Sequence, residues 1–467
     1  MNPIILIHII NMKHKNFLNI LLFLLISFSI NSQDHSIHKK WKLDGADERI
    51  EKNRKGDVIL EFVLDAKINK RSKSSIQLDL KNHDFKFGVS FTQLRRFWGQ
   101  DYGDLYLERF KEVFNYATIG MYWQLTDERS NSKFMDNYYK GILEWTKKND
   151  IRVKGHPLMW HEAMPNWVRN YNNIDELDGI IKAHMKRLIE SYPQINDWDV
   201  YNEPIGPFKP HIPPSSITEW IKQKGGIYPA MVEIYEFVNS VNPNKNYSNN
   251  HYHAKDPEFF KINEFFIEKN LNYSSIGMQA HMQSNDNVMS EEQLWNQIED
   301  YAILGKNIQF TEITVTSSER FKNWKDHQAF LAKRDEIISK GGELDLESKP
   351  EYEEYQANYL KDFYTLAFSH PSVTSITFWN MTDQNAWRGH AGGLLFKDLK
   401  PKKAFNTLKQ LVNEKWTTKI NQDIISNTFN FNGFYGKYQG KVIVNNKEYK
   451  FEFYHSKSNK DPIKIYL

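Results

Sequence analysis

Eight short apolar segments recur along the chain, separated by segments with helical spacing, and this alternation most limits the possible folds. The segments, each with its first residue, are FKFGVSF (Phe85), FNYATIGMYW (Phe114), IRVKGHPLMW (Ile151), WDVYNEP (Trp198), NYSNNHY (Asn246), SIGMQAHM (Ser275), NIQFTEITV (Asn307) and SITFWNM (Ser375). Between them, apolar residues recur at spacings of three and four, for example at Leu107, Phe110 and Phe114. Eight strands that alternate with helices predict a closed parallel α/β barrel, the (β/α)8 or TIM barrel.

Polar and aromatic side chains gather where these predicted strands end. A (β/α)8 barrel carries its chemistry at the carboxyl ends of its strands. The residues at those ends are His156, Trp160, His161, Asn202, Glu203, Gln279, His281, Glu312 and Trp379. We therefore expect these side chains to line one mouth of the barrel.

Two glutamates stand out in this group because each ends an apolar strand. Glu203 precedes Pro204, which cannot donate a ladder hydrogen bond, and Glu312 ends the seventh strand. Strands four and seven lie nearly opposite each other in an eight-stranded barrel. Facing carboxylates suit glycoside hydrolysis, in which one protonates the leaving oxygen and the other attacks the sugar or activates water. A single glutamate at a strand end is usually structural, but two facing glutamates among Trp, His, Asn and Gln favour catalysis.

Length and composition agree with one large barrel. The 467 residues suit one large barrel with additions. Lys and Arg number 61 against 58 acidic residues, and this near balance gives no reason to expect a nucleic-acid partner. The 13 Trp and 24 Tyr suit a sugar-binding cleft, although large cores also use aromatic residues. The absence of cysteine excludes disulfides, thiolate metal sites and a cysteine nucleophile.

The N-terminal region has the layout of a secretory signal. Lys13 and Lys15 precede an apolar run from Leu18 to Ile30, and small and polar residues follow. A membrane anchor is the alternative, but the run is shorter than the ~20 residues that a spanning helix needs. We therefore expect removal of residues 1–32 and export to the periplasm, the cell surface or the medium. No other segment is apolar enough to span a membrane, so we expect no membrane association after signal removal.

Both ends of the predicted barrel carry β-rich segments. In the C-terminal one, Val442 and Val444 alternate with polar residues, NNK forms a turn, and Tyr449, Phe451 and Phe453 alternate again, as in a hairpin. The aromatic residues could bind sugar, but strict alternation favours a packed core face. Both ends are candidates for one small β module. The expected layout is signal 1–32, N-terminal β-rich segment 33–83, catalytic barrel 84–412 and C-terminal β module 413–467.

Five ordered motifs resemble those of the glycoside hydrolase family 10 endo-xylanases. They are GHPLMWHEAMPNWV, WDVYNEP, IGMQAHM, TEITV and GLLFKDLKPKKAF, and the resemblance runs from about Phe85 to Leu411. The resemblance implies a (β/α)8 barrel and hydrolysis with retention at the anomeric carbon. It also implies that Glu203 is the acid/base and Glu312 the nucleophile, with no metal and no cofactor.

The same resemblance implies roles for the surrounding residues. His281 would donate to the nucleophile, Asn202 would bond the sugar 2-hydroxyl, and Gln279 would bridge the two glutamates. The remaining substrate-binding candidates are His156, Trp160, Trp379, Trp387 and Asn250. Structural alternatives remain for three of them, namely a core histidine at His156, plain packing at Trp160 and a loop asparagine at Asn250.

The sequence departs from the family pattern on the non-reducing side of the reacting sugar. The usual Glu-Asn pair after strand two is absent, Tyr122 stands where a lysine is expected, and Ala163 replaces a glutamine. These losses suggest a rebuilt, more aromatic subsite formed by Tyr122 and Trp123. Thr314 replaces an aspartate that normally orients the supporting histidine, so we expect a lower pKa for His281 than in the family.

Three other readings compete with a β-xylan hydrolase. The same chemistry could act on another β-glycan, or the chain could be a carbohydrate-binding protein without catalysis, although both glutamates are present. A metalloenzyme would draw on His156, His161, His251, His253 and His281. However, His156 and His161 are five residues apart on a predicted strand and point to opposite faces. The expected partner is a poly- or oligosaccharide substrate, and we expect a monomer.

Overall fold

The computed structural model describes residues 36–467, apart from 65–67, 69–72, 131–132, 211 and 460. The predicted secretion signal, residues 1–32, therefore lies outside the described residues. Within the described part of the chain, no helix has both the length and the apolar character needed to cross a membrane.

The eight predicted strands form one closed parallel barrel. They are β3 (Lys86–Ser90), β4 (Tyr116–Gly120), β5 (Arg152–His156), β6 (Asp197–Asn202), β7 (Asn246–His251), β8 (Ser275–Met278), β10 (Asn307–Val315) and β11 (Val373–Phe378). Neighbouring strands pair in chain order, and β11 pairs with both β10 and β3, which closes the sheet. The predicted (β/α)8 barrel is confirmed.

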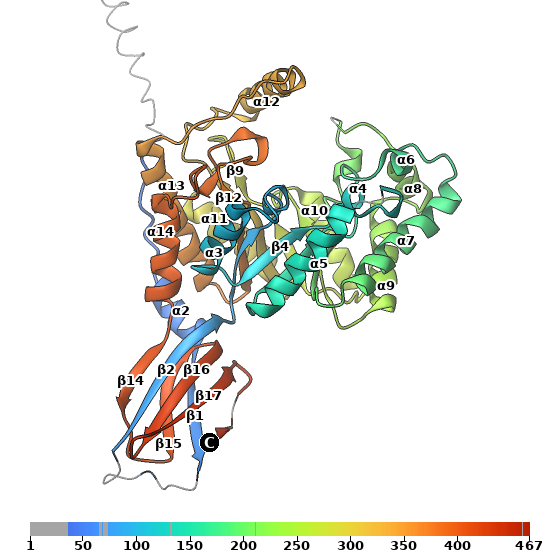
Figure 1. Cartoon of the computed structure of the whole chain (residues 1–467). Coiled ribbons are helices and arrows are strands. Elements are labelled where there is room, and N and C mark those ends of the chain that lie inside the picture. The colour runs from blue at the N-terminus through green and yellow to red at the C-terminus, as the bar shows by residue number, and fades with distance from the viewer. Residues whose placement is uncertain (1–35, 65–67, 69–72, 131–132, 211, 460) are drawn as a thin grey trace, which may run out of the picture.

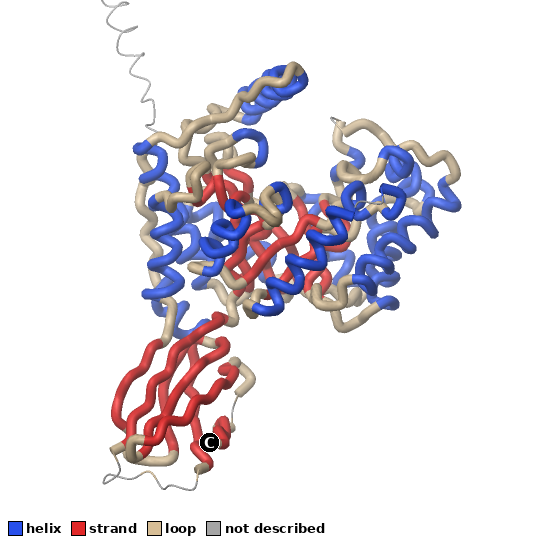
Figure 2. Tube along the Cα trace, viewed as in Figure 1, coloured by secondary structure: helices blue, strands red, loops and turns tan. Residues whose placement is uncertain are grey.

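Helices cover the outside of the barrel, one after each strand (Figures 1 and 2). They are α3 (Asp101–Lys111), α5 (Lys133–Lys148), α7 (Ile174–Ser191), α9 (Ile227–Val241), α10 (Pro257–Glu268), α11 (Glu291–Ala302), α13 (Pro350–Ser369) and α14 (Lys403–Gln410). In α7 the Asn173 side chain accepts from the Glu176 amide and so caps the helix. One face of α7 is buried, and it carries Leu177, Ile181, His184 and Leu188 at spacings of three and four.

Shorter elements extend the strand–helix connections. They are the helices α4 (Trp123–Thr126), α6 (Asn166–Arg169), α8 (Ser216–Gln223) and α12 (Trp324–Ser339), and the strands β9 (His281–Met282), β12 (Asn380–Thr382) and β13 (Gly393–Leu395). The 3₁₀ turns are Leu94–Arg96, Glu128–Ser130, Gly206–Phe208 and Trp387–Gly389. Because α4, α6, β9 and α12 come directly after strands, they build the mouth of the barrel rather than its base.

Strands from both ends of the chain form a small β module below the barrel (Figure 1). One sheet has the order β15 (Thr428–Phe434), β1 (Lys55–Val63), β18 (Ile463–Tyr466), and the other β14 (Lys419–Asp423), β2 (Ser74–His83), β16 (Gly436–Val444), β17 (Lys447–His455). Val442, Val444, Phe451 and Phe453 are buried in its separate apolar core, as their alternation predicted. Tyr449 packs against this core while partly exposed.

The β module adjoins the amino ends of the barrel strands. Strand β2 ends at His83 and β3 begins at Lys86, so the chain passes directly from the module into the base of the barrel. Arg54, at the end of α2 (Ala46–Arg54), donates to the backbone oxygens of Phe368, His370 and Val373 at 2.6–2.7 Å. These contacts fix the module at the face opposite the barrel mouth.

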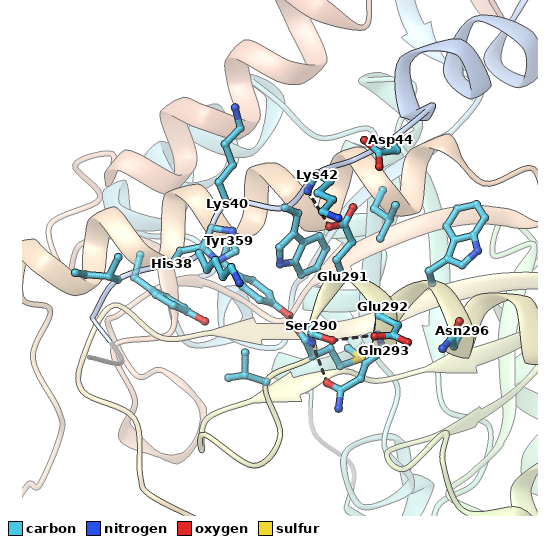
Figure 3. Close-up of a pocket in the computed structure, with 18 of the residues that line it drawn as sticks. His38, Lys40, Lys42, Asp44, Ser290, Glu291, Glu292, Gln293, Asn296 and Tyr359 are labelled. Atoms are coloured by element: carbon cyan, nitrogen blue, oxygen red, sulfur yellow. Dashed lines mark hydrogen bonds between the residues drawn. The ribbon is translucent and has the colours of Figure 1, made fainter. Parts of the chain in front are cut away.

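The segment that precedes α2 lies across α11 and α13 on the outside of the barrel (Figure 3). The backbone amides of Lys42 and Leu43 donate to the Glu291 carboxylate at 2.8 and 2.6 Å, and the Trp41 amide donates to Asp362. A cavity of about 920 Å³ lies beside this segment. Neither of the two predicted catalytic glutamates lines it.

Candidate active site

Glu203 follows the end of β6 with an unusual backbone conformation. Its φ of 59° lies in the left-handed region, which costs a non-glycine residue of order 1–3 kcal/mol and is typical of functional sites. Two hydrogen bonds fix this turn: the Glu203 amide donates to Asn250 O at 2.9 Å, and the Gly206 amide donates to Glu203 O at 2.8 Å. The β6–β7 pairing shifts register just before this point, between Asp199 and Asn202. Such irregularities at strand ends re-aim side chains.

The Glu203 carboxyl group is buried and has two hydrogen-bond donors. Gln279 Nε2 donates to Oε1 at 2.8 Å and Trp160 Nε1 donates to Oε2 at 3.2 Å. Burial raises the pKa of Glu203 to about 7. The hydrogen bond from Gln279 lowers this pKa, whereas the charges of Glu162 and Glu312 add to the increase. Glu203 can therefore hold a proton near neutral pH, as a general acid must.

Glu312 lies in β10, beside a register shift between Phe310 and Ile313. Asn250 Nδ2 donates to its Oε1 at 2.9 Å, and His281 Nε2 lies 3.3 Å from its Oε2. A third nitrogen, His156 Nε2, lies 3.8 Å from Glu312 Oε1. The two glutamates thus differ in their surroundings, since nitrogen groups from three strands converge on Glu312.

Asn250 connects several of the predicted site residues. It is fully buried in β7, and its Nδ2 donates both to Glu312 and to Asn202 Oδ1, the latter at 2.8 Å. Its Oδ1 accepts from Thr311 Oγ1 at 2.7 Å. Asn250 is therefore no loop residue, and its contacts place it behind Glu312 and Asn202.

Sequence reasoning missed a charged network in the barrel interior. Asp199 Oδ2 lies 2.8 Å from His156 Nδ1, and Asp199 Oδ1 lies 2.6 Å from both Lys154 Nζ and Ser248 Oγ. Burial lowers the pKa of His156, but the nearby charges of Glu312 and Asp199 outweigh it and leave the pKa above its usual value. His156 is thus a buried histidine held by Asp199 and directed at Glu312. The available signal was a charged residue inside the apolar segment WDVYNEP.

His281 sits between Glu312 and Thr314. Its Nδ1 lies 3.0 Å from Thr314 Oγ1, and β9 pairs His281 with Thr314 across the sheet. Burial lowers the pKa of His281 and outweighs the opposing contact with Glu312. A neutral His281 that donates from Nε2 to Glu312 can accept the Thr314 hydroxyl at Nδ1.

Aromatic rings surround the two histidines. The Trp379 ring packs edge-on against His156 and His281, with centroids 5.7 and 6.0 Å apart. Trp387 packs at a tilt on His281 at 4.5 Å, and the Arg388 guanidinium lies 4.1 Å from the Trp387 ring. These contacts bring the predicted substrate-binding residues of β5, β9 and β11 together at one mouth.

The two rings predicted to form an aromatic subsite, Tyr122 and Trp123, lie in different surroundings. Tyr122 contacts the rings of His156 and Trp160, with centroids 5.7 and 5.8 Å apart. Burial, with the charges of Glu312 and Glu203, raises the pKa of the Tyr122 hydroxyl, so this side chain faces the site. The expectation for Trp123 is wrong: this buried residue stacks on His184 of α7, with centroids 4.2 Å apart, and faces the helix layer.

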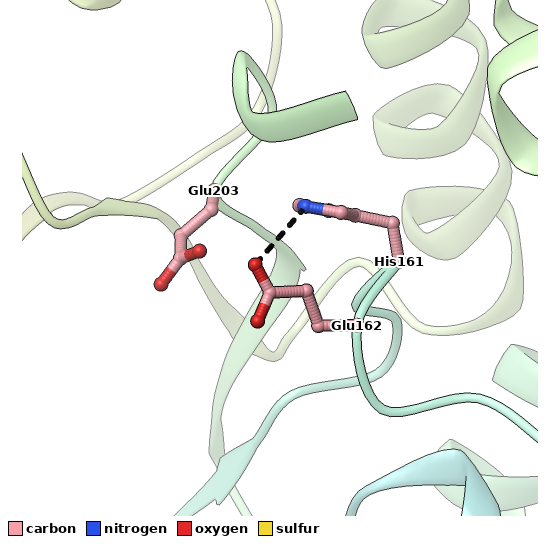
Figure 4. Close-up of side chains that lie close together, drawn as sticks. All are labelled: His161, Glu162 and Glu203. Atoms are coloured by element: carbon pink, nitrogen blue, oxygen red, sulfur yellow. Dashed lines mark ion pairs between the residues drawn. The ribbon is translucent and has the colours of Figure 1, made fainter. Parts of the chain in front are cut away.

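The described residues contain one group of three side chains able to hold a metal ion: His161, Glu162 and Glu203 (Figure 4). Of the five histidines of the alternative metalloenzyme reading, His161 alone belongs to this group among the described residues. His156 bonds Asp199, and the ring of His251 packs against Tyr252 and Phe259.

The fold is a (β/α)8 barrel, and two buried glutamates lie at the carboxyl ends of different strands, among aromatic and amide side chains. This is the architecture and chemistry of a glycoside hydrolase. Comparison with known families identifies the chain further. It belongs to Glycosyl hydrolase family 10, whose family profile matches residues 76–411. The family suggested by the sequence motifs, and the assignment as a glycoside hydrolase, are thus confirmed.

Individual relatives are distant in sequence. Endo-1,4-beta-xylanase B of Thermotoga neapolitana is 23% identical over 379 residues, which cover 77% of this chain and 99% of that protein. Anti-sigma-I factor RsgI6 of Acetivibrio thermocellus is 24% identical over 421 residues, but these cover only 47% of that protein. The crystal structure of native xylanase 10B from Thermotoga maritima shares the fold with a TM-score of 0.56 at 22% identity, covering 71% of this chain and 96% of that one.

Proposed function

We propose that the protein cleaves β-1,4 linkages in xylan, or in a related decorated or mixed-linkage β-xylan, by double displacement at Glu203 and Glu312. The observation that carries the proposal is the contrast between the two glutamates. Glu203 is buried so that it holds a proton near pH 7, whereas Glu312 accepts hydrogen bonds from Asn250 and His281. The xylan substrate is supported by the names of the relatives.

In the first displacement, Glu203 gives its proton to the glycosidic oxygen while a Glu312 oxygen attacks the anomeric carbon. The bond to the leaving sugar breaks, that sugar departs as an alcohol, and a covalent glycosyl–Glu312 ester forms. Asn250, His281 and His156 position the attacking carboxylate. Trp160 and Gln279 orient the acid by donating to its carboxyl oxygens.

In the second displacement, Glu203 acts as a base. It takes a proton from water as the water oxygen attacks the anomeric carbon, and Glu312 leaves as a carboxylate. Two inversions give a product with the original β configuration. Asn202, oriented by the Asn250 amide, is suited to hold the sugar 2-hydroxyl, while Trp379 and Trp387 cover the reacting ring.

Variants of the two glutamates test these roles. Glu312→Ala should abolish turnover of every substrate. Glu203→Ala should spare aryl glycosides with activated leaving groups, which need little acid assistance. Equal losses on activated and natural substrates would contradict the acid/base role of Glu203. Product NMR should show the β-anomer first, and an initial α-product would rule out retention.

The substrate preference should differ from that of a typical family member. The family's Glu-Asn pair, its lysine (here Tyr122) and its glutamine (here Ala163), which would hold a second sugar, are absent. A lost hydrogen bond to a sugar hydroxyl costs ~0.5–1.5 kcal/mol when both partners are neutral, and more when one is charged. With Trp123 packed elsewhere, Tyr122 and Trp160 are the rings that can replace them. We therefore infer weak cleavage of short plain xylo-oligosaccharides and better cleavage of decorated or mixed-linkage chains.

The test compares kcat/KM on xylotetraose with kcat/KM on decorated and mixed-linkage xylans, in the native protein and in Tyr122→Lys. The lysine variant should lose activity on the preferred chain. If xylotetraose is cleaved as efficiently as any of them, the departures at this subsite are neutral.

Two alternatives remain open to experiment. Product analysis on a panel of β-glycans separates a xylan-directed enzyme from a hydrolase of another β-glycan. One relative is named as an anti-sigma factor, which favours testing a carbohydrate-binding protein without catalysis as the second alternative. Such a protein would bind xylan by calorimetry with no release of reducing ends. The distinct surroundings of Glu203 and Glu312 argue for catalysis, since binding alone requires neither.

We also propose that the protein is exported. The apolar run from Leu18 to Ile30 after two lysines supports removal of about the first 32 residues. Mass spectrometry of the protein from its native source should find a mature chain that lacks this run.

A further inference from the structure

We propose that His161, Glu162 and Glu203 form an inhibitory site for Zn²⁺ or a similar divalent transition-metal ion at the acid/base of the enzyme. One donor atom from each residue lies within 4.8 Å of the others (Figure 4). The imidazole and two carboxylates are a donor set that zinc accepts. Because the site includes Glu203, an ion bound there would block the step that needs a proton on Glu203.

The state of His161 is the second observation that points to a ligand. Its side chain is 2% exposed, yet neither ring nitrogen has a hydrogen-bond partner among the described residues. Buried polar groups without partners are uncommon and call for an explanation. A metal ion at Nε2 would give a partner to one of these two ring nitrogens.

The geometry leaves room for an ion between the ring and the neighbouring carboxylate. His161 Nε2 lies 3.9 Å from Glu162 Oε1, beyond hydrogen-bond distance. An ion with Zn–N and Zn–O distances of about 2.0–2.2 Å fits between two ligand atoms that far apart. Glu162 has a side-chain exposure of 42%, so it can move by the small amount that tetrahedral geometry requires. The site is thus built around the buried His161 and completed by the exposed Glu162 carboxylate.

Charges around the three residues favour a cation on balance. The negative charges of Glu162 and Glu312 face Glu203, and both raise its pKa. Arg388 and Arg169 carry opposing positive charges. Burial lowers the pKa of Arg388, and the nearby charges of Glu203 and Glu162 oppose that effect. The Arg169 guanidinium donates to the Glu162 backbone oxygen at 3.0 Å. A bound Zn²⁺ would displace the Glu203 proton to solvent and convert the acid into a metal-bound carboxylate.

Glu162→Gln is the decisive variant because Glu162 is exposed and lies outside the predicted catalytic set. Zn²⁺ binding by calorimetry and inhibition of hydrolysis should both be measured on the full chain, each relative to the same protein without metal. Losing one ligand should weaken binding and inhibition at least about tenfold, since even outer-shell partners of metal ligands contribute 10–100-fold. Glu268→Gln, which changes another exposed carboxylate on the outer helix α10, should behave like the native protein.

Two further measurements test whether the bound ion causes the inhibition. EDTA should restore full activity, and His161→Gln should also lose the site if circular dichroism shows that it folds. Equal Zn²⁺ inhibition of the native protein and Glu162→Gln, or no Zn²⁺ binding to the native protein, would overturn the proposal. The calorimetric comparison decides the metal site even if the xylan substrate proves wrong, because it needs no turnover.

Discussion

Replacing Glu162 by glutamine should shift the pH dependence of hydrolysis in a defined direction. Glu203 must be protonated to donate to the leaving oxygen, so activity on natural substrates falls as pH rises through its pKa of about 7. Burial is the main cause of that raised pKa, and Glu162 is the first of the neighbouring charges that add to it. Removing the Glu162 charge should therefore lower the pKa of Glu203 and move the alkaline limb to lower pH.

The size of the shift follows from Coulomb's law. Donor atoms of Glu162 and Glu203 lie within 4.8 Å, and the Glu162 side chain is 42% exposed. At that distance and a water-like dielectric constant, two unit charges interact by about 0.9 kcal/mol, or about 0.6 pH units. The expected result is about a fourfold loss of kcat/KM at pH 8, where only a small fraction of Glu203 is protonated, and little change at pH 5.5.

The assay is the pH profile of kcat/KM on unactivated xylan oligosaccharides, normalised at pH 5.5. Glu162→Asp keeps the charge and should keep the alkaline limb near its original position. An activated aryl glycoside should show a smaller shift, because its departure needs little acid assistance. An alkaline limb of Glu162→Gln that coincides with the native one, or moves upward, would refute the electrostatic role of Glu162.

Three further predictions concern the surrounding structure. Thr314→Asp should place a negative charge beside His281 and raise the pKa of its ring, which histidine NMR titration measures; an unchanged titration would contradict the contact. Asn250→Ala should lower kcat far more than it changes KM, because the lost buried partner leaves Glu312 misplaced at a cost of ~1–3 kcal/mol; a pure KM effect would point to substrate binding instead. Phe453→Ala should lower the free energy of unfolding by ~3–5 kcal/mol with kcat/KM unchanged, because this ring is stacked in the core of the β module, remote from the barrel mouth; a urea titration that shows no change would contradict the packing.

The barrel could be predicted from the sequence because its strands and helices are local patterns. Each strand is a short apolar run and each helix has its own spacing, and the order of pairing follows the order of the chain. The glutamates could be located for the same reason, since the end of a strand is visible in the sequence. The pairing of β1 with β15 and β18, and of β2 with β14 and β16, joins segments more than 300 residues apart, and only alternation and composition indicated it.

Contacts between strands could not be predicted in the same way. Asp199 lies within a buried strand, and the residues around it in the sequence do not indicate that Lys154 and His156 are its partners. Those contacts depend on the register between β5 and β6. Trp123 was wrongly placed for a related reason. It follows Tyr122, but α4 begins at Trp123, so the direction of the chain changes between these two residues.

The structure separates the chemistry of the site from the choice of its substrate. The side chains that form hydrogen bonds with Glu203 and Glu312 come from β5, β7, β8 and the segments that follow these strands. Tyr122 follows β4, and it contacts this group by packing its ring on His156 and Trp160. Replacing the polar groups after β4 therefore leaves the hydrogen bonds of both carboxylates intact. A change in this loop can alter which sugar chain is bound next to the reacting ring without altering how the bond is broken. For this reason small activated substrates that fill only the reacting subsite should be cleaved at ordinary rates, while longer chains should be discriminated by their neighbouring sugars.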